Sequence, residues 1–415
     1  MNNRPIKTIG TYYHRMYNGG IEHIQAELIN LWISMGYQVV LYTAEPENPQ
    51  DFDYDHSVKH VVISNTDHDL RLRQLKESFI EDQVDCFVEH NWACGCMEEE
   101  IGLAHSLGIK YILYVHGHYT ALYTYYVTDF ALESLRVFRK CDAVITLSSL
   151  NKRFYDMIGC KAYQMMNPVP GELKCIENKK RPHNRHMLWI GRIDDGKRIE
   201  EALEIFALVL KQVPDAYLDV VGTGPKHYIK LINKMAKELN IVEHVKFHGY
   251  QKEVAHFYDE ADVLLFTSEK EGSPVTLLES RAHALPVVMY DLSYLEIVKD
   301  NLGVRKLPLG DVDAMAASAI DILLDDVKID VLSDEANQSF QMVLDYPIKD
   351  KWRELLKQME EDDFYLCPKE KDEDMQMWDF LLAELKKGIS FNTVHNIDYQ
   401  VGNKLLKIPR KLLGR

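Results

Sequence analysis

The sequence predicts an α/β protein with two Rossmann-like domains, each built on a parallel sheet, followed by a helical C-terminal extension. Three observations support this fold class. The chain has 415 residues, which is too long for one hydrophobic core. Short apolar runs alternate with segments of helical periodicity, and this alternation stops at residues 167–172 and then restarts. Strands that alternate with helices form right-handed β-α-β units and therefore parallel sheets.

The first predicted domain covers residues 1–172. Its expected strands are rich in β-branched and aromatic residues and cover residues 7–14, 37–44, 85–91, 110–118 and 142–149. Helices are expected from residue 21 onward, where apolar residues recur at helical spacing, and over residues 97–107. Proline and glycine in "NPVPGE" (167–172) predict a linker to the next domain.

The second predicted domain covers residues 173–345. Its expected strands are residues 186–193, 216–222, 245–250, 262–268 and 286–290. The helices predicted between them are residues 199–213, 226–239, 253–260 and about 274–284.

Residues 346–415 form the predicted extension, which we expect to cross back to the N-terminal domain. Residues 348–361 and 377–388 have helical patterns. Residues 404–415 carry five basic side chains and no acidic one, so they could lie on the inner face of an anionic membrane. The alternatives are a short helix packed on the protein and a solvated tail.

The composition excludes some classes of function. A formal net charge of -16 argues against general nucleic-acid binding, which needs a basic surface. No apolar run reaches the roughly 18 residues that span a bilayer, and the N-terminus lacks the apolar core of a secretory signal. The seven cysteines have no framework spacing, which suggests reduced thiols. These features predict a cytoplasmic protein.

The stretch "SEKEGSPVTLLESRAHALP" (268–286) carries the strongest functional signal. The strand before it ends at Ser268, and ligands of doubly wound sheets bind beyond the carboxyl ends of strands. Ser273 followed by Pro274 predicts a helix start there, with Ser273 as the cap. Glu271 then lies in the loop and Glu279 on the helix.

The first amides of this helix predict an anion site between the two carboxylates. Helix N-termini bind phosphate through free N–H groups and the helix dipole, here those of Val275, Thr276 and Leu277. A diphosphate flanked by two hydroxyl-rich groups, as in a nucleotide sugar, matches this arrangement. The alternative is a capped helix with two solvated glutamates.

Five motifs, in order along the chain, resemble those of glycosyltransferase family 4. They are "NGGIEHIQAEL" (18–28), "YVHGH" (114–118), "GRIDDGKR" (191–198), "VVGTGP" (220–225) and the E-x7-E pattern at 271–279. The resemblance covers about residues 6–345. It implies the GT-B fold, in which two Rossmann-like domains face each other across a cleft, with the acceptor on the N-terminal side and the donor on the C-terminal side.

The resemblance also implies roles for four catalytic residues. Arg192 and Lys197 offset the charge of the leaving diphosphate, a task that suits their forked and compact cations. Glu271 positions the sugar hydroxyls, and His116 contacts the donor sugar near the reacting carbon. The alternative for Arg192 and Lys197 is that they are ordinary surface charges. The alternative for His116 is that its hydrogen bonds are all made to neighbouring protein groups. His118 is a weaker candidate, because Gly117 intervenes.

The remaining expected residues bind the donor. Glycines let a backbone approach a ligand closely, Glu279 holds the ribose, and Tyr250 holds the nucleobase or is a partly buried packing residue. The expected donor-binding set is Gly19, Gly20, Gly191, Gly272, Ser273, Pro274, Val275, Thr276, Leu277, Glu279 and Tyr250.

By resemblance, the reaction is sugar transfer with retention, from a nucleotide-diphosphate donor, most simply uridine-based. The acceptor is a glycan, a lipid-linked sugar, a wall polymer or a protein-linked sugar.

No cofactor or essential metal is expected, and the D-x-D-like stretches 51–55 and 311–313 are interpreted as solvated loops. Alternatives are a sugar-nucleotide epimerase and a catalytically idle partner of another glycosyltransferase. A dinucleotide-dependent oxidoreductase is disfavoured, because "GTGPKH" (222–227) lacks the third glycine.

Overall fold

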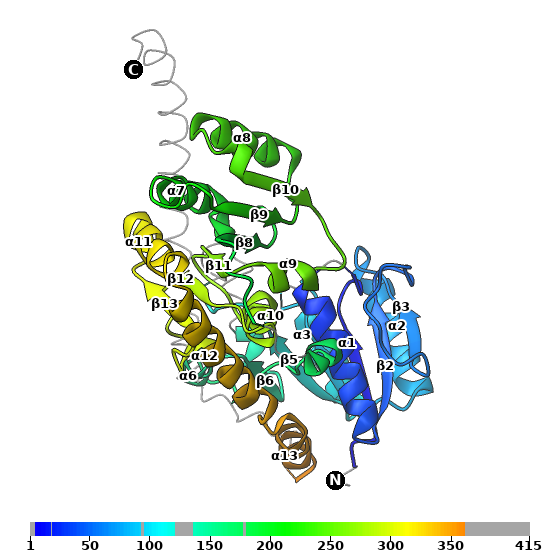
Figure 1. Cartoon of the computed structure of the whole chain (residues 1–415). Coiled ribbons are helices and arrows are strands. Elements are labelled where there is room, and N and C mark those ends of the chain that lie inside the picture. Colours follow the sequence, from blue (N-terminus) through cyan, green and yellow to red (C-terminus); the bar gives the residue numbers. More distant parts are fainter. Residues whose placement is uncertain (1–4, 18, 93–94, 121–135, 177–179, 362–415) are drawn as a thin grey trace.

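The computed structural model describes residues 5–17, 19–92, 95–120, 136–176 and 180–361. These residues form two lobes, each with a parallel sheet covered by helices (Figure 1). The two sheets are separate, and the chain passes from one to the other at the predicted linker. The predicted fold class of two parallel α/β units is confirmed.

The N-terminal lobe contains a seven-stranded sheet. Its strands are β1 (Thr8–Tyr12), β2 (Gln38–Thr43), β3 (Lys59–Val62), β4 (Cys86–Glu89), β5 (Lys110–Val115), β6 (Ala143–Thr146) and β7 (Ala162–Gln164). Its helices are α1 (Gly20–Ser34), α2 (His68–Glu81), α3 (Met97–Ser106) and α6 (Ser149–Met157). The strand order is β3-β2-β1-β4-β5-β6-β7. Every residue of β1 is buried, because helices cover both faces of a parallel sheet.

The C-terminal lobe contains a six-stranded sheet. Its strands are β8 (His186–Ile190), β9 (Tyr217–Val221), β10 (Val245–Gly249), β11 (Val263–Phe266), β12 (Val287–Tyr290) and β13 (Val304–Leu307), in the order β10-β9-β8-β11-β12-β13. Its helices are α7 (Ile199–Leu210), α8 (Lys226–Glu238), α9 (Ala255–Glu260), α10 (Val275–Ala282), α11 (Val312–Leu323) and α12 (Asp326–Leu344).

In both sheets the strand order reverses direction next to the first strand. β1 lies between β2 and β4, and β8 lies between β9 and β11. Such a reversal opens a crevice outside the carboxyl ends of the central strands, where doubly wound sheets bind ligands. The loops after β1, β5, β8 and β11 therefore form the predicted ligand edge.

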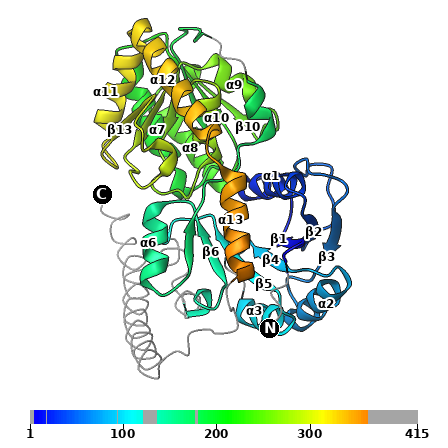
Figure 2. The same cartoon turned by 90° about the horizontal axis from the view of Figure 1, so that it is seen from below.

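Helix α13 (Ile348–Glu361) leaves the C-terminal lobe and packs on the N-terminal lobe (Figure 2). Trp352 is fully buried and meets the Trp32 ring of α1 edge-on, with ring centroids 5.0 Å apart. The Ile6 amide donates a 2.7 Å hydrogen bond to Oε1 of Glu360. This helix therefore fastens the two lobes together behind the crevice.

Two expectations for the C-terminal segment lie outside the described residues, namely the helix at 377–388 and the basic tail at 404–415. Within the described part of the chain, no helix is both long and apolar enough to cross a membrane.

Replacing Trp352 with alanine should destabilise the protein by about 3–5 kcal/mol, because a buried indole is lost and a cavity remains. The matched control is Arg353→Ala on the exposed face of the same helix, for which we expect a change within about 0.5 kcal/mol. Denaturant unfolding measures both. An unchanged midpoint for Trp352→Ala would contradict the packing of α13.

Candidate active site

Lys197 and Glu271 form an ion pair in the loops beyond the carboxyl ends of β8 and β11. Lys197 Nζ donates a hydrogen bond to Glu271 Oε1, and the two side chains are only 22% and 13% exposed. Lys197 ends a short 3-10 helix after β8, and Glu271 lies in the loop after β11. The Tyr294 hydroxyl accepts a 2.9 Å hydrogen bond from the Glu271 amide and so fixes this loop. The structure thus brings two predicted catalytic residues into direct contact.

The loops after β8 and β11 are tied together by their backbones. The Thr267 hydroxyl donates to the Lys197 carbonyl at 2.7 Å, and the Glu269 amide donates to the Gly196 carbonyl at 3.1 Å. Thr267 also accepts a 3.0 Å hydrogen bond from Trp189 Nε1 within the core. These hydrogen bonds therefore hold the loops that carry Lys197 and Glu271 against each other and against the sheet.

The small residues of "VVGTGP" make room for the Lys197 loop. A Cβ atom at Gly222 would lie 1.9 Å from the Gly191 carbonyl oxygen, and one at Gly224 would lie 2.0 Å from the Ile193 oxygen. Gly222 also has φ of 133°, which disfavours L side chains. Both positions therefore need glycine so that the Gly191–Lys197 segment can lie at the crevice.

Arg192 lies apart from the Lys197–Glu271 pair. Its side chain is 78% exposed and pairs with Asp194 Oδ2 at 3.3 Å. Its charge also acts on the buried carboxylate of Glu22, at the start of α1 in the other lobe. Arg192 thus lies at the same loop as Lys197 without touching the Lys197–Glu271 pair.

Helix α10 begins one residue later than predicted, and the prediction that Ser273 caps it is wrong. The N-cap is Pro274, with φ of -69°, and no side chain caps the helix. The Leu277 amide donates to the Pro274 carbonyl at 3.1 Å, so it is not a free donor as predicted. The first turn still leaves the amides of Val275 and Thr276 without an acceptor within the helix.

Glu279 is held within α10 by Tyr258 of α9, whose hydroxyl donates to Glu279 Oε2. Burial raises the pKa of Glu279, and the Tyr258 hydrogen bond opposes this rise only in part. The ionised carboxylate is therefore poorly solvated in the free protein. A ligand with hydroxyl donors would relieve this cost.

Of the two predicted glycines of the N-terminal lobe, Gly20 lies next to α10. A Cβ atom at Gly20 would lie 3.5 Å from Cγ2 of Val275. Gly19 is the N-cap of α1, and the Glu22 carboxylate folds back against it. Arg15 Nε donates to Glu22 Oε1 at 3.0 Å. The glycine loop and the α10 N-terminus are thus near contact with each other where the two lobes meet.

Gly272 lies in close contact with the backbone of the other lobe. A Cβ atom there would lie 1.6 Å from the His116 carbonyl oxygen and 3.2 Å from Cα of Gly117. Two other contacts join the lobes nearby. The Ser149 amide donates to Glu296 Oε1 at 2.7 Å, and Lys299 Nζ donates to the Ser149 hydroxyl at 2.8 Å. The lobes are closed at this edge.

His116 follows β5, as predicted, and its side chain is largely enclosed. Its ring stacks on Tyr114 with centroids 4.6 Å apart, and its Nε2 lies 2.8 Å from Nδ1 of the buried His90. Burial lowers the pKa of His116 to about 3, so the imidazole is neutral at physiological pH. It can donate or accept a hydrogen bond but cannot supply a positive charge.

Two aromatic neighbours lie at the margin of the site. Tyr250, after β10, is 51% exposed, and nucleobase binding stays a prediction beside the alternative of a partly buried aromatic residue. The His118 ring packs against Tyr294 of the other lobe, with centroids 4.2 Å apart. His118 therefore contributes to the contact between the lobes.

One group of side chains among the described residues could hold a metal ion. His23, Glu27 and Glu172 bring one ligand atom each within 4.8 Å of one another. These atoms already have partners, since His23 Nε2 lies 3.1 Å from Glu172 Oε1 and the Gly171 amide donates to Glu27. Of the two D-x-D-like stretches, 311–313 begins a helix, with Asp311 as its N-cap, so its interpretation as a loop is wrong.

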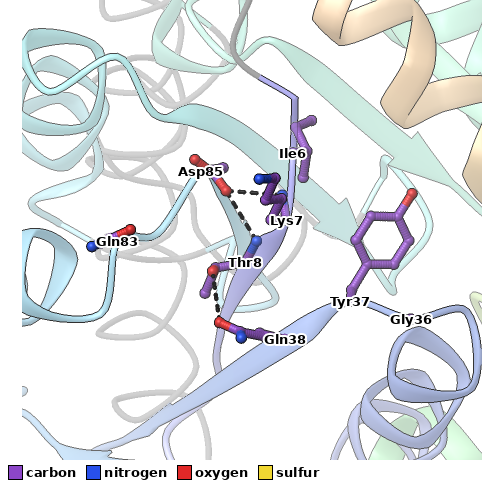
Figure 3. Close-up of a pocket in the computed structure, with 8 residues that line it drawn as sticks. All are labelled: Ile6, Lys7, Thr8, Gly36, Tyr37, Gln38, Gln83 and Asp85. Atoms are coloured by element: carbon purple, nitrogen blue, oxygen red, sulfur yellow. Dashed lines mark hydrogen bonds between the residues drawn. The ribbon is translucent and has the colours of Figure 1, made fainter.

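A cavity of about 370 Å³ opens at the amino ends of β1 and β2, the edge opposite the candidate site (Figure 3). Its carboxylate, Asp85, already accepts hydrogen bonds from the Lys7 and Thr8 amides at 2.8 and 3.0 Å. Asp85 therefore anchors the start of β1, and ligands of doubly wound sheets bind at the other edge.

Sequence reasoning missed four residues that support the site, namely Glu22, His90, Tyr258 and Tyr294. His90, Tyr258 and Tyr294 each touch a predicted residue that lies 21 to 26 positions away in the sequence, on a different element. Glu22 instead folds back on Gly19, three residues before it. Of these four residues, only Glu22 could have been predicted from a sequence motif, because it follows the glycine pair at the start of an expected helix.

Comparisons with known proteins match this chain to glycosyltransferases. Residues 18–161 match the family model described as "Glycosyltransferase Family 4", and residues 184–326 match the one described as "Glycosyl transferases group 1". An uncharacterised glycosyltransferase of Haemophilus influenzae is 23% identical over 66% of this chain and 78% of its own. The N-acetyl-alpha-D-glucosaminyl L-malate synthase of Bacillus anthracis is 30% identical over 34% of this chain and 36% of its own.

Solved structures share the architecture. TarM superposes with a TM-score of 0.72 at 13% identity, over 86% of this chain and 100% of its own. The HepE protein of Anabaena, solved with UDP and glucose, has a TM-score of 0.68 at 15% identity, over 85% of this chain and all of its own. A variant of TarM from S. aureus was solved with UDP, fondaparinux and alpha-GlcNAc-glycerol. The predicted GT-B fold is confirmed.

Replacing Gly272 with alanine should push the lobes apart, because the new methyl group would overlap the His116 carbonyl oxygen. Small-angle X-ray scattering should show a larger radius of gyration for this variant. Gly102→Ala on α3 is the matched control, since its Cβ would meet nothing within 4 Å. Identical scattering from Gly272→Ala and the wild type would contradict the closed arrangement.

Replacing Glu279 with glutamine should stabilise the protein at neutral pH. The raised pKa means that the folded state binds its proton more tightly than the unfolded state does, so ionisation of Glu279 costs stability as pH rises. The advantage of Glu279→Gln should be present at about pH 7.5 and vanish below the ordinary glutamate pKa of about 4.3.

Melting temperatures across this pH range measure the effect, with the exposed Glu243→Gln as the control for net charge. A wild type that is more stable than Glu279→Gln at neutral pH would show that burial of this carboxylate carries no cost.

Proposed function

We propose that this chain, which belongs to the group 1 glycosyltransferases of family 4, transfers a sugar from a uridine diphosphate sugar with retention of configuration. The observation that carries the proposal is the Lys197–Glu271 pair, which lies in the loops beside the open first turn of α10. The UDP in the HepE and TarM structures supports a uridine donor. The acceptor is a glycan or a lipid-linked, wall-polymer or protein-linked sugar.

The diphosphate would bind at the N-terminus of α10. The amides of Val275 and Thr276 and the helix dipole supply partial positive charge there. Lys197 adds a full charge from the adjoining loop, and the exposed Arg192 can reach the same anion from the rim of the crevice. Together they would stabilise the negative charge that develops on the leaving diphosphate.

The two carboxylates would hold the hydroxyl groups at either side of the diphosphate. In the free protein Lys197 neutralises Glu271. When a donor binds, its phosphate would compete for the ammonium group and leave Glu271 to accept hydrogen bonds from the sugar. Glu279, held by Tyr258, would accept hydrogen bonds from the ribose.

Retention requires that the acceptor attack from the face that the leaving group vacates. The leaving phosphate would then take the acceptor's proton, so no side chain has to act as a strong base. The neutral His116 fits this scheme, because it can make a hydrogen bond to the sugar without placing a cation beside the carbon that becomes electron-poor. We expect no essential metal ion or cofactor.

The alternatives differ in what they do with a donor. A catalytically idle partner would bind a nucleotide without transfer, and an epimerase would change the free sugar nucleotide. The intact Lys197–Glu271 pair favours transfer. Cytoplasmic location and membrane contact through residues 404–415 stay predictions.

A panel of nucleotide sugars tests this function by thermal shift and by sugar release. A donor at a hundredfold excess over its Kd should stabilise the protein by about 2.7 kcal/mol, and uridine donors should do so best. Lys197→Ala should slow transfer by about 100-fold, since a preorganised charge at the leaving group is lost. Arg192→Ala should also slow it.

Lys211→Ala, on the exposed end of the segment after α7, is the matched control and should leave turnover unchanged. If neither uridine nor guanosine diphosphate stabilises the wild type, the donor proposal is wrong. Normal turnover in both Lys197→Ala and Arg192→Ala would remove the proposed charge mechanism.

A further inference from the structure

A chain of buried hydrogen bonds leads from α1 to His116. Gln25 Nε2 donates to the Thr11 hydroxyl at 3.2 Å, and this hydroxyl lies 3.1 Å from His90 Nε2. His90 Nδ1 in turn lies 2.8 Å from His116 Nε2. Gln25, Thr11 and His90 are each 0% exposed, so water does not compete for these bonds. The chain therefore connects His116 to three fully buried side chains.

One arrangement of protons gives each bond of the chain a donor and an acceptor. In it, Thr11 accepts from Gln25 and donates its own hydroxyl proton to His90 Nε2. A neutral imidazole has one N–H and one bare nitrogen, so in this arrangement His90 carries its proton on Nδ1 and donates it to Nε2 of His116. His116 then carries its own proton on Nδ1.

Burial keeps both rings neutral. It lowers the pKa of His90 well below the usual value and that of His116 to about 3. Tyr114 holds the rings in place, since it stacks on His116 at 4.6 Å and on His90 at 5.2 Å between centroids. The Tyr114 hydroxyl is itself fixed by a 2.9 Å hydrogen bond to Oδ1 of Asn167.

We propose that His90 is a positioning residue that holds His116 in the neutral Nδ1–H tautomer, so that His116 offers a hydrogen-bond donor to an oxygen atom of the donor sugar. This inference rests on the proposed function. With the opposite tautomer, His116 would turn a lone pair toward the sugar oxygen, and the contact would be lost. In this proposal His90 does not touch the substrate, so it acts on the reaction only through His116.

Nuclear magnetic resonance of the full chain, with histidine labelled by nitrogen-15, tests the proposal without any ligand. Two-bond correlations between ring protons and nitrogens distinguish the tautomers, and His116→Ala identifies the signals of His116. We expect the Nδ1–H form in the wild type and in His90→Asn, whose amide nitrogen replaces Nδ1 as the donor. His90→Phe should give a mixture of both forms.

His186→Asn is the matched control, because His186 is equally buried but lies on β8 in the other lobe. It should leave the His116 signals unchanged. The Nε2–H form of His116 in the wild type would overturn the proposal, and this result requires no variant to fold. An unchanged tautomer in a folded His90→Phe would overturn it as well.

Kinetics separate a positioning role from a structural one. Loss of one hydrogen bond to His116 should lower kcat about tenfold in His90→Phe, with little change in KM for the donor. His90→Asn should restore most of kcat. In a His116→Ala background, adding His90→Phe should cost nothing further, because its effect passes through His116.

An equal loss from His90→Phe with and without His116 would overturn the positioning role. If the wild type transfers no sugar from any donor of the panel, the proposed function fails, but the tautomer measurement still decides whether His90 controls His116. The two failures are therefore distinguishable.

Discussion

The contact between Gly272 and the His116 carbonyl is the constraint on which the site depends. It joins the loop after β11 to the loop after β5, so it sets the distance between the two lobes where their functional residues meet. Any side chain at position 272 would overlap the backbone of the other lobe. The same closure places Gly20 opposite Val275 and packs His118 against Tyr294. α13 also holds the two lobes together, because Trp352 is buried beside Trp32 in the core of the N-terminal lobe.

The charged side chains Glu279, Lys197 and Glu271 contribute little to the stability of the free protein and are better suited to binding a ligand. Burial raises the pKa of Glu279, and the hydrogen bond from Tyr258 and the charge of His23 oppose this rise in part. Lys197 and Glu271 neutralise each other in the free protein, and such pairs contribute little net stability once desolvation is counted. In the proposed complex, the diphosphate would bind Lys197, and the sugar and ribose hydroxyl groups would donate hydrogen bonds to Glu271 and Glu279. Binding sites of this kind often store such local costs.

Much of the fold could be predicted, because its central strands and amphipathic helices have clear periodicity. The elements that escaped prediction are β3, α2, α6, β7, β13, α11 and α12. β3, for example, is short and none of its residues is buried. Motif spacing predicted Lys197, Glu271 and His116 as site residues, and the structure places them in the loops after β8, β11 and β5. It gave the wrong cap for α10, since Ser273 followed by Pro274 satisfies the usual rule while the backbone turns one residue later. His90 and Tyr258 were missed, because pairing between distant elements leaves no local pattern.

A crystal structure of the chain with uridine diphosphate would test the central claim most directly. We predict phosphate oxygens within hydrogen-bonding distance of the Val275 or Thr276 amide and of Lys197 Nζ, with Glu271 released from its ion pair. A diphosphate bound elsewhere, with the Lys197–Glu271 pair intact and the first turn of α10 untouched, would contradict the account.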